Sequence, residues 1–177
     1  GEVMRRLGAA SVTLAGPDIF PSLQNGSIDA AEWVGPWNDM AFGFFRLAKY
    51  FYWPGFHEPG SSLAAGFNLN VWESFTKQQQ AVVRAACAAE NDYTLAEYNA
   101  HNGAALKTLV EKHGVQLRRF PDEVVAALKK TSREVLEDAA KEDPFTAKVY
   151  QSFLNFLETT SEWTRIGDEG FVEARRS

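Results

Sequence analysis

The sequence contains few of the residues that most directly reveal chemistry. It holds one cysteine and three histidines among 177 residues. Cys87 has no partner within the chain, which excludes a disulfide scaffold but does not choose between cytoplasm and periplasm. Neither Gly-x-Gly-x-x-Gly nor Gly-x-x-x-x-Gly-Lys occurs, so a nucleotide cofactor is disfavoured. A Gly-x-Ser-x-Gly motif is also missing, which disfavours a serine hydrolase.

Long apolar runs and basic clusters are scarce as well. No run approaches the roughly 18 residues that cross a membrane, and residues 1–20 lack the features of a secretory signal. The formal net charge is -5, from 18 Lys+Arg and 23 Asp+Glu, which disfavours nucleic acid as a partner. With 45% hydrophobic residues, a chain of this length predicts one well-filled core or two small ones.

Aromatic residues are abundant, and they are concentrated in one segment. Ten of the 24 residues in the range 33–56 are aromatic, and the charged residues there are Asp39, Arg46 and Lys49. Residues 122–148 show the reverse, with many charges of both signs. We interpret the aromatic block as an interior or ligand-facing region and the charged segment as solvated helices.

The first 60 residues alternate between helical and extended patterns that end at turn residues. Helices are expected over 2–7, over 18–25 with Asp18 as the cap, and over 36–48, and extended segments over 11–15, 28–33 and 50–53. Such alternation is typical of an α/β layer with a mainly parallel sheet.

The remainder of the chain is mostly helical. After an apolar extended stretch over 63–69, Thr76 begins a helical run to about Lys112, with Gln79 placed to complete a capping box. This helix of about 55 Å is too long for a compact domain with a radius of gyration of about 16 Å, so it either breaks near Asn102-Gly103 or spans more than one structural unit. A short strand over 115–117 and helices over 121–141 and 143–158 are expected to follow.

The histidines give one candidate for a binding site. His101 and His113 are twelve residues apart on the helical run, which is not the spacing of a shared metal, so plain surface or core roles are expected for both. His57 lies in a loop between Pro54-Gly55 and Pro59-Gly60, directly after an expected strand. Because α/β proteins place ligand contacts in such loops, His57 either lines a site or is an exposed loop residue.

Two carboxylates stand beside the aromatic block. Glu32 immediately precedes Trp33 at the end of one extended segment, and Glu58 follows the next. A carboxylate among aromatic side chains is poorly hydrated and needs a cation, a metal ion or a bound hydroxyl as a partner. Hard cations such as Na⁺ and Ca²⁺ favour oxygen ligands of this kind.

Other interpretations of these carboxylates stay open. Glu32 could form a buried salt bridge with Arg46 or Lys49, and Asp29 has an equal claim on spacing but fits a turn or a cap. A glycan-active enzyme could use Asp29, Glu32 or Glu58 as a carboxylate pair. A helical interaction module over residues 76–160 is a third possibility, although it leaves the aromatic block unexplained.

The segment from Gly16 to Pro36, and above all Asp29–Pro36 (Asp-Ala-Ala-Glu-Trp-Val-Gly-Pro), resembles the signature stretch of TRAP transporter solute-binding proteins. The branch it resembles among these DctP-type receptors binds 2-oxo acids or lactate. Tyr50–Gly60, Phe67–Ser74 and the long helix are also similar to this family. The resemblance covers essentially the whole chain and corresponds to the C-terminal portion of such a receptor.

The resemblance implies a two-lobed α/β receptor, of the periplasmic-binding-protein type II class, that closes on its ligand by hinge bending. Residues 1–62 would form part of the ligand-binding lobe, 63–75 the hinge strand and connection, and 76–177 the long bracing helix and C-terminal helical region. The N-terminal lobe and its ligand-clamping arginine are not in this sequence, and Arg5 and Arg6 are not expected to take over that role.

The function implied is binding without catalysis. Such a receptor captures a small monocarboxylate such as pyruvate or lactate in the periplasm and delivers it to the TRAP membrane permease. The resemblance implies a Na⁺ or Ca²⁺ ion that bridges ligand and protein, held by the Glu32 carboxylate, the Trp33 backbone carbonyl and Glu58. Trp33, Phe56 and His57 would contact the ligand. The missing lobe, or another chain, is an expected partner.

Overall fold

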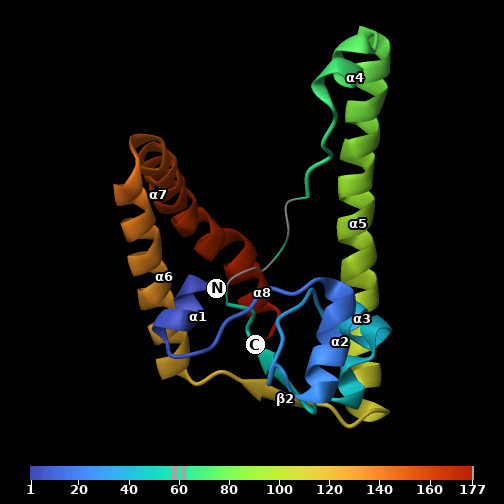
Figure 1. Cartoon of the computed structure of the whole chain (residues 1–177), viewed down its shortest axis with the longest axis vertical. Helices are drawn as coiled ribbons and strands as arrows, with labels where there is room; N and C mark the ends of the chain where they lie inside the picture. The colour runs from blue at the N-terminus through green and yellow to red at the C-terminus, as the bar shows by residue number, and fades with distance from the viewer. Residues whose placement is uncertain (57–59, 61–62, 177) are drawn as a thin grey trace. The chain divides into compact units, whose positions relative to one another are not determined.

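The computed structural model describes residues 1–56, 60 and 63–176. The chain divides into two compact units, which are treated separately below (Figure 1). The mixed unit is Thr13–Phe120, and the helical unit combines Gly1–Val12 with Pro121–Ser177. Residues 76–160 therefore do not form one module, because the long helix belongs to the mixed unit and the helices after residue 120 belong to the other.

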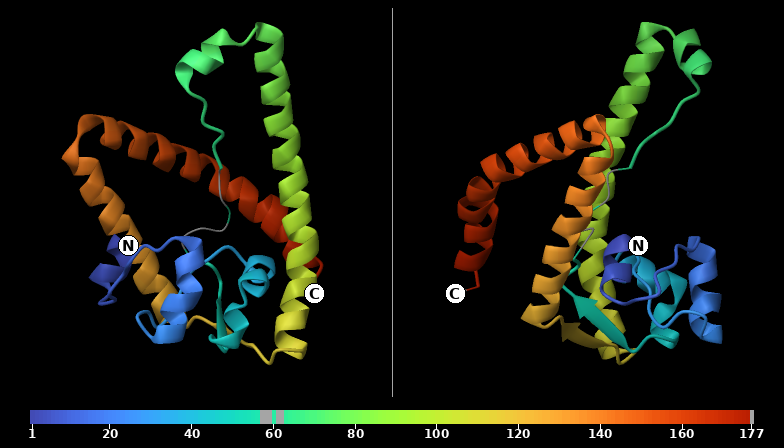
Figure 2. Two further views of the ribbon diagram at one scale, coloured as in Figure 1. Left: turned by 45° about the vertical axis from the view of Figure 1, so that its right-hand side comes forward. Right: turned by 60° about the vertical axis from the view of Figure 1, so that its left-hand side comes forward.

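The mixed unit contains helices, a short 3-10 turn and a pair of strands. In chain order these are α2 (Gly16–Asn25), α3 (Pro36–Phe42), η1 (Phe44–Arg46), β1 (Tyr50–Trp53), α4 (Leu69–Ser74), α5 (Lys77–Glu111) and β2 (Gln116–Arg119). Within this unit α3 packs against α5 (Figure 2), and Ile19 of α2 and Phe44 are buried.

The sheet is parallel, as the sequence predicts. Tyr50 lies opposite Gln116 and Trp53 opposite Arg119. The Gln116 N–H donates to the Lys49 carbonyl, and the Phe120 N–H donates to the Trp53 carbonyl, both at 2.8 Å, so the pairing extends past both ends. The strand expected over 50–53 is confirmed, and the one expected at 115–117 begins at Gln116. Parallel strands need a long crossover connection, and here it contains α5.

The long helix α5 is continuous over 35 residues, so the break considered near Asn102-Gly103 does not occur. Its capping box is present: the Thr76 hydroxyl accepts from the Gln79 N–H at 3.2 Å, and Gln79 Oε1 accepts from the Thr76 N–H at 2.8 Å. Its buried residues, Ala105 and Leu109, lie in the C-terminal third of the helix. The helix ends before Gly114, whose φ of +69° favours glycine.

Several expected elements are absent or shorter. Residues 11–15 form no strand, because among the described residues β1 and β2 pair only with each other and an extended segment without a partner is not a sheet. Residues 28–33 are irregular apart from a bend at Asp29. The helix expected over 36–48 ends at Phe42, because Gly43 is left-handed with φ +74°.

Two further predictions need correction. Asp18 does not cap α2, which begins at Gly16 with Pro17 in its first turn and Ala15 as the N-cap; Asp18 lies in the first turn, where its charge is favourable. The range 63–75, expected to hold a hinge strand, contains α4, while residues 63–68 have no regular structure. Asn68 caps α4 by accepting from the N–H groups of Asn70 and Val71. The division of function at residues 62 and 75 stays a prediction.

The helical unit contains α1 (Glu2–Arg6), α6 (Asp122–Glu142), α7 (Pro144–Thr164), a π-helical turn η2 (Arg165–Glu169) and α8 (Gly170–Ala174). The Arg6 guanidinium donates to Asp138 at 2.9 Å and joins α1 to α6. Asp143 caps α7 by accepting from the N–H groups of Phe145 and Thr146. The expected helices are confirmed, although α7 continues to Thr164. No described helix is both long and apolar enough to cross a membrane.

Replacing Leu109 with alanine should destabilise the mixed unit. Leu109 is 2% exposed, so the substitution leaves a cavity and should lower the free energy of unfolding by about 2–5 kcal/mol. Urea denaturation measures the change. Leu95→Ala on the same helix, where the side chain is 63% exposed, is the matched control and should cost less than about 1 kcal/mol. Equal effects of the two substitutions would contradict this assignment of the core.

Candidate functional site

The turn that leads into α3 is anchored by Trp33. Its ring contacts Phe42 with the ring centroids 5.2 Å apart, and a Cβ added to Gly16 would lie only 2.8 Å from Trp33 Cη2. Glycine at position 16 thus leaves room for the indole over the start of α2. The indole Nε1 is buried and has no hydrogen-bond partner within the described part of the chain. The side chain of Trp33 is therefore occupied with packing.

The first turn of α3 begins three residues after Trp33 in the sequence. It contains side-chain oxygens that accept no hydrogen bond from the described residues. The Gly35 N–H donates to the carboxyl group of Asp39, but Asp39 Oδ1 and Asn38 Oδ1 are buried without a hydrogen-bond partner among the described residues. Burial and, to a smaller extent, the negative charge of Glu32 together raise the pKa of Asp39 to about 6, although the Gly35 hydrogen bond acts to lower it. The turn is thus rich in acceptors, which is the environment that a hard cation favours.

The aromatic block packs partly against the long helix. His101 stacks on Trp37 with the ring centroids 4.5 Å apart, and His113 stacks on Phe45 at 3.9 Å. Both histidines thus have the packing roles expected for them. The Arg46 guanidinium lies over the rings of Phe20 and Phe45, 5.3 and 6.0 Å from their centroids. These contacts fix α3 and η1 around the turn that carries Glu32 and Trp33.

The second group of candidate residues follows β1. Phe56 is 37% exposed and meets Phe120 edge to face, with the centroids 6.2 Å apart. It therefore lies near the carboxyl end of the parallel sheet. His57 and Glu58 fall outside the described residues, so their predicted roles stay predictions.

The described residues contain no group of three His, Cys, Asp or Glu side chains that could hold a metal ion. Glu32 and Asp39 are a pair of carboxylates, and Glu58 is outside the described ranges. Asn38 and Asp39 were not among the sequence-predicted site residues. The available signal was that Asp39 is one of three charged residues in an aromatic block, between Trp37 and Phe42, where burial of its carboxyl group is expected.

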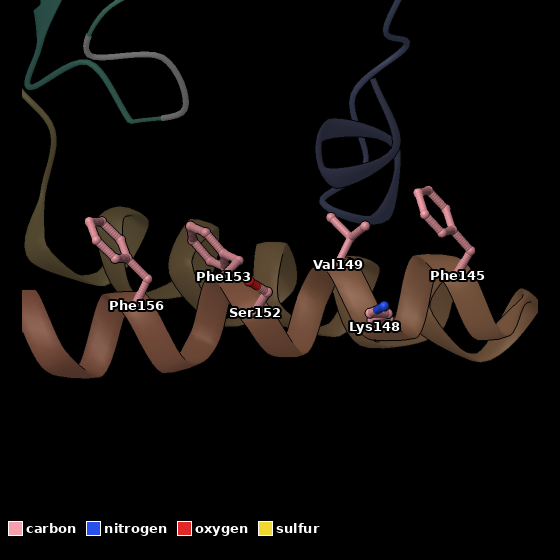
Figure 3. A pocket seen from close by; sticks show the side chains of 6 residues that line it. All are labelled: Phe145, Lys148, Val149, Ser152, Phe153 and Phe156. Carbon is pink, nitrogen blue, oxygen red and sulfur yellow. The ribbon is translucent and has the colours of Figure 1, made fainter.

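A groove in the helical unit has different chemistry. It runs along α7 (Figure 3) and is lined by Phe145, Lys148, Val149, Ser152, Phe153 and Phe156. The apolar side chains are spaced three or four residues apart and point to one side of the helix. Because its lining contains no carboxylate, this groove does not fit a bound cation, and the α3 turn is the better candidate site.

Comparison with known proteins decides the family. The model of the family described as bacterial extracellular solute-binding protein, family 7, matches residues 1–143. The chain belongs to this family. The resemblance to solute receptors noted in the sequence is thus confirmed.

Relatives of this family-7 chain are about twice as long. A monocarboxylate 2-oxoacid-binding periplasmic protein of a Nostoc species is 36% identical over 168 residues, which are 95% of this chain and 46% of that protein. A TRAP transporter solute-binding protein from Bordetella bronchiseptica, with calcium and picolinate bound, matches with a TM-score of 0.94 at 32% identity. The match covers 98% of this chain and 51% of that one. This chain therefore spans about half the length of these relatives.

Two further solved TRAP periplasmic solute-binding proteins have the same fold. The one from Colwellia psychrerythraea holds calcium and pyruvate and matches with a TM-score of 0.92 at 31% identity. The one from Pseudoalteromonas atlantica holds sodium and pyruvate and matches at 0.86 and 30% identity. Each match covers 98% of this family-7 chain and 53% of the solved one. The expected fold class, part of a periplasmic receptor fold, is confirmed.

The carboxyl group of Asp39 should make stability depend on pH. Its folded-state pKa of about 6 lies above the ordinary value of 3.8, so the stability that it contributes is complete below pH 3.8 and is lost as pH rises through 6. With EDTA present, the free energy of unfolding of the wild type relative to Asp39→Asn should fall by about 1–2 kcal/mol between pH 4 and 7.5, since partial exposure screens the effect.

Urea denaturation at both pH values measures this difference, and Asp143→Asn provides a control whose difference from the wild type should change little, because both pH values lie above the ordinary pKa of Asp143, 3.8. The hydrogen bond from the Thr146 hydroxyl, together with the N–H groups that Asp143 caps, lowers the pKa of Asp143. Its contribution should therefore be present above the ordinary pKa and lost as pH falls. An Asp39→Asn difference that did not change with pH would show that this carboxyl group is hydrated in the folded chain.

Proposed function

We propose that this chain forms part of the receptor of a TRAP transporter that binds a small monocarboxylate, either a 2-oxo acid such as pyruvate or the 2-hydroxy acid lactate, together with a cation. The observation that carries the proposal is the acceptor-rich turn at the start of α3, where the buried Asp39 carboxyl group lies within electrostatic range of Glu32. A ligand that is itself an anion fits such a turn only if positive charge comes with it.

The relatives support this ligand class. Among three solved proteins at 30–32% identity, each binds a metal cation together with either pyruvate or picolinate, both of which are monocarboxylates. The Nostoc relative is named for binding monocarboxylate 2-oxo acids. The conserved chemistry is thus a cation paired with a carboxylate, and the oxygen-rich turn of this chain fits the same pair.

Individual residues have separate roles in the proposal. When bound, a Na⁺ or Ca²⁺ ion supplies the positive charge that links the ligand oxygens to the protein oxygens. Glu32 contributes its carboxylate, and Trp33 contributes its backbone carbonyl, in keeping with an indole that is used for packing against Phe42. Glu58 is a further cation ligand, while Trp33, Phe56 and His57 contact the organic acid.

The proposed role is capture and delivery, in which no covalent bond is made or broken. The receptor takes up its ligand in the periplasm and presents it to the membrane permease of the transporter. The length of the relatives supports a second lobe as a partner of this chain, either from the same protein or from another. A carboxylate that coordinates a cation, which in turn binds the organic acid, explains these residues without any acid–base catalysis.

Replacing Glu32 should remove cation-dependent ligand binding. After dialysis against EDTA, the protein as its gene encodes it should bind pyruvate only when CaCl₂ or NaCl is restored, as measured by isothermal titration calorimetry. Glu32→Gln keeps the shape but removes the charge, so the dissociation constant for pyruvate should rise by more than about tenfold. Asp29→Asn removes an exposed carboxylate three residues earlier and should change the dissociation constant for pyruvate little.

Two outcomes would contradict the proposal. Pyruvate and lactate that failed to bind in the presence of either cation would exclude this ligand class. Binding that was equally strong with EDTA and with calcium would exclude the cation, and equal effects of Asp29→Asn and Glu32→Gln would remove Glu32 from the site.

A further inference from the structure

The proposed cation site is supported by a residue from a distant part of the chain. Asn102 lies in the C-terminal third of α5, next to Gly103, where a break in the helix was one of two possibilities that the sequence left open. The helix is continuous, and Asn102 Oδ1 instead accepts a hydrogen bond from the backbone N–H of Trp37 at 3.1 Å. The two residues are 65 positions apart in the sequence, and the bond between them is partly buried.

The hydrogen bond from Trp37 to Asn102 replaces a missing N-cap acceptor at the start of α3. The first N–H groups of a helix have no partner within the helix and are usually satisfied by the side chain of the N-cap residue. The N-cap of α3 is Gly35, which has no side chain, and Pro36 has no N–H to offer. Asn102 therefore provides from α5 the acceptor that a local cap would normally supply.

Gly35 lies close to the same Asn102 side chain. A Cβ added to Gly35 would lie 3.3 Å from Asn102 Oδ1 and 3.7 Å from its Nδ2. The backbone of Gly35 is extended, with φ 164° and ψ 179°, so any residue could adopt it. Glycine at this position is therefore explained by the close approach of Asn102 and not by backbone conformation.

Further contacts hold the same turn. The ring of Trp37 stacks on His101 at 4.5 Å between centroids and meets Tyr98 edge to face at 5.2 Å. The Gly35 N–H donates to the carboxyl group of Asp39. Gly35 thus interacts with both Asn102 and Asp39, and Glu32 and Trp33 are only a few peptide units before it in the sequence.

We propose that Asn102 is a positioning residue for the cation and ligand site at Glu32 and Trp33. Asn102 fixes the distance between the Gly35–Trp37 turn and α5. The position of this turn then determines where the Glu32 carboxylate and the Trp33 carbonyl lie. Cation ligands must converge within a few tenths of an ångström, so a shift of the turn weakens binding even though Asn102 touches neither ion nor ligand. The inference rests on the function proposed above.

Three variants test the hydrogen bond. In the protein as its gene encodes it, Asn102→Ala should raise the dissociation constant for pyruvate in saturating CaCl₂ by about tenfold. Asn102→Asp keeps an acceptor oxygen for the Trp37 N–H and should restore affinity to within about threefold of the wild type. Asn99 is an exposed residue of the same helix, so Asn99→Ala should leave the dissociation constant for pyruvate unchanged. Rescue by aspartate separates positioning from a general loss of stability.

A double-mutant cycle tests the close approach and covers the case in which Asn102→Ala does not fold. Gly35→Ala should weaken pyruvate binding on its own, because the added Cβ presses on Asn102, but should have no further effect when combined with Asn102→Ala. If Asn102→Ala is unfolded, the same effect of Gly35→Ala should disappear in the Asn102→Ser background, whose shorter side chain leaves room.

The outcomes separate this inference from the proposed function. Full affinity in Asn102→Ala, failure of Asn102→Asp to restore binding, or additive effects of the substitutions at positions 35 and 102 would overturn the role of Asn102 while leaving the receptor function intact. A wild-type protein that binds no pyruvate in the presence of calcium would contradict the proposed function, and this inference with it.

Discussion

The packing of α3 on α5 is the interaction on which the candidate site depends. A seven-residue helix has too few internal hydrogen bonds to be stable alone, so its position is set by what it contacts. Trp37 contacts α5 in two ways, through its ring on His101 and through its N–H group on Asn102. Because Glu32 and Trp33 lie just before this helix in the sequence, the proposed role of Asn102, in the C-terminal third of α5, is to set the position of the proposed cation ligands.

The electrostatics of the turn follow from that position. The carboxyl group of Asp39 is partly buried, and the nearby charge of Glu32 makes its ionisation still less favourable. A buried carboxylate next to a second, exposed one is costly to ionise unless a cation offsets the negative charge. In the proposed receptor, a bound cation would offset the cost of burying this negative charge, which would link ligand affinity to the packing of the fold.

Features of the fold that depend on residues close together in the sequence could be predicted from the sequence. The capping box at Thr76, the strand at 50–53 and the α5 terminus before Gly114 depend on neighbouring residues and were predicted correctly. The strand at 11–15 was not, because alternation indicates an extended segment but not whether a partner strand lies beside it. Glu32 and Trp33 were proposed from their motif, and their role as cation ligands stays a prediction. The contact of Asn102 with Trp37 spans 65 residues, and no local pattern reveals it.

A crystal structure of the protein grown with CaCl₂ and pyruvate tests the central claim most directly. The account predicts a calcium ion, identified by its anomalous signal, at about 2.3–2.6 Å from a carboxylate oxygen of Glu32 and from the backbone carbonyl oxygen of Trp33, with the pyruvate oxygens completing the coordination. A calcium ion bound elsewhere, or pyruvate bound with no ion beside Glu32, would contradict it.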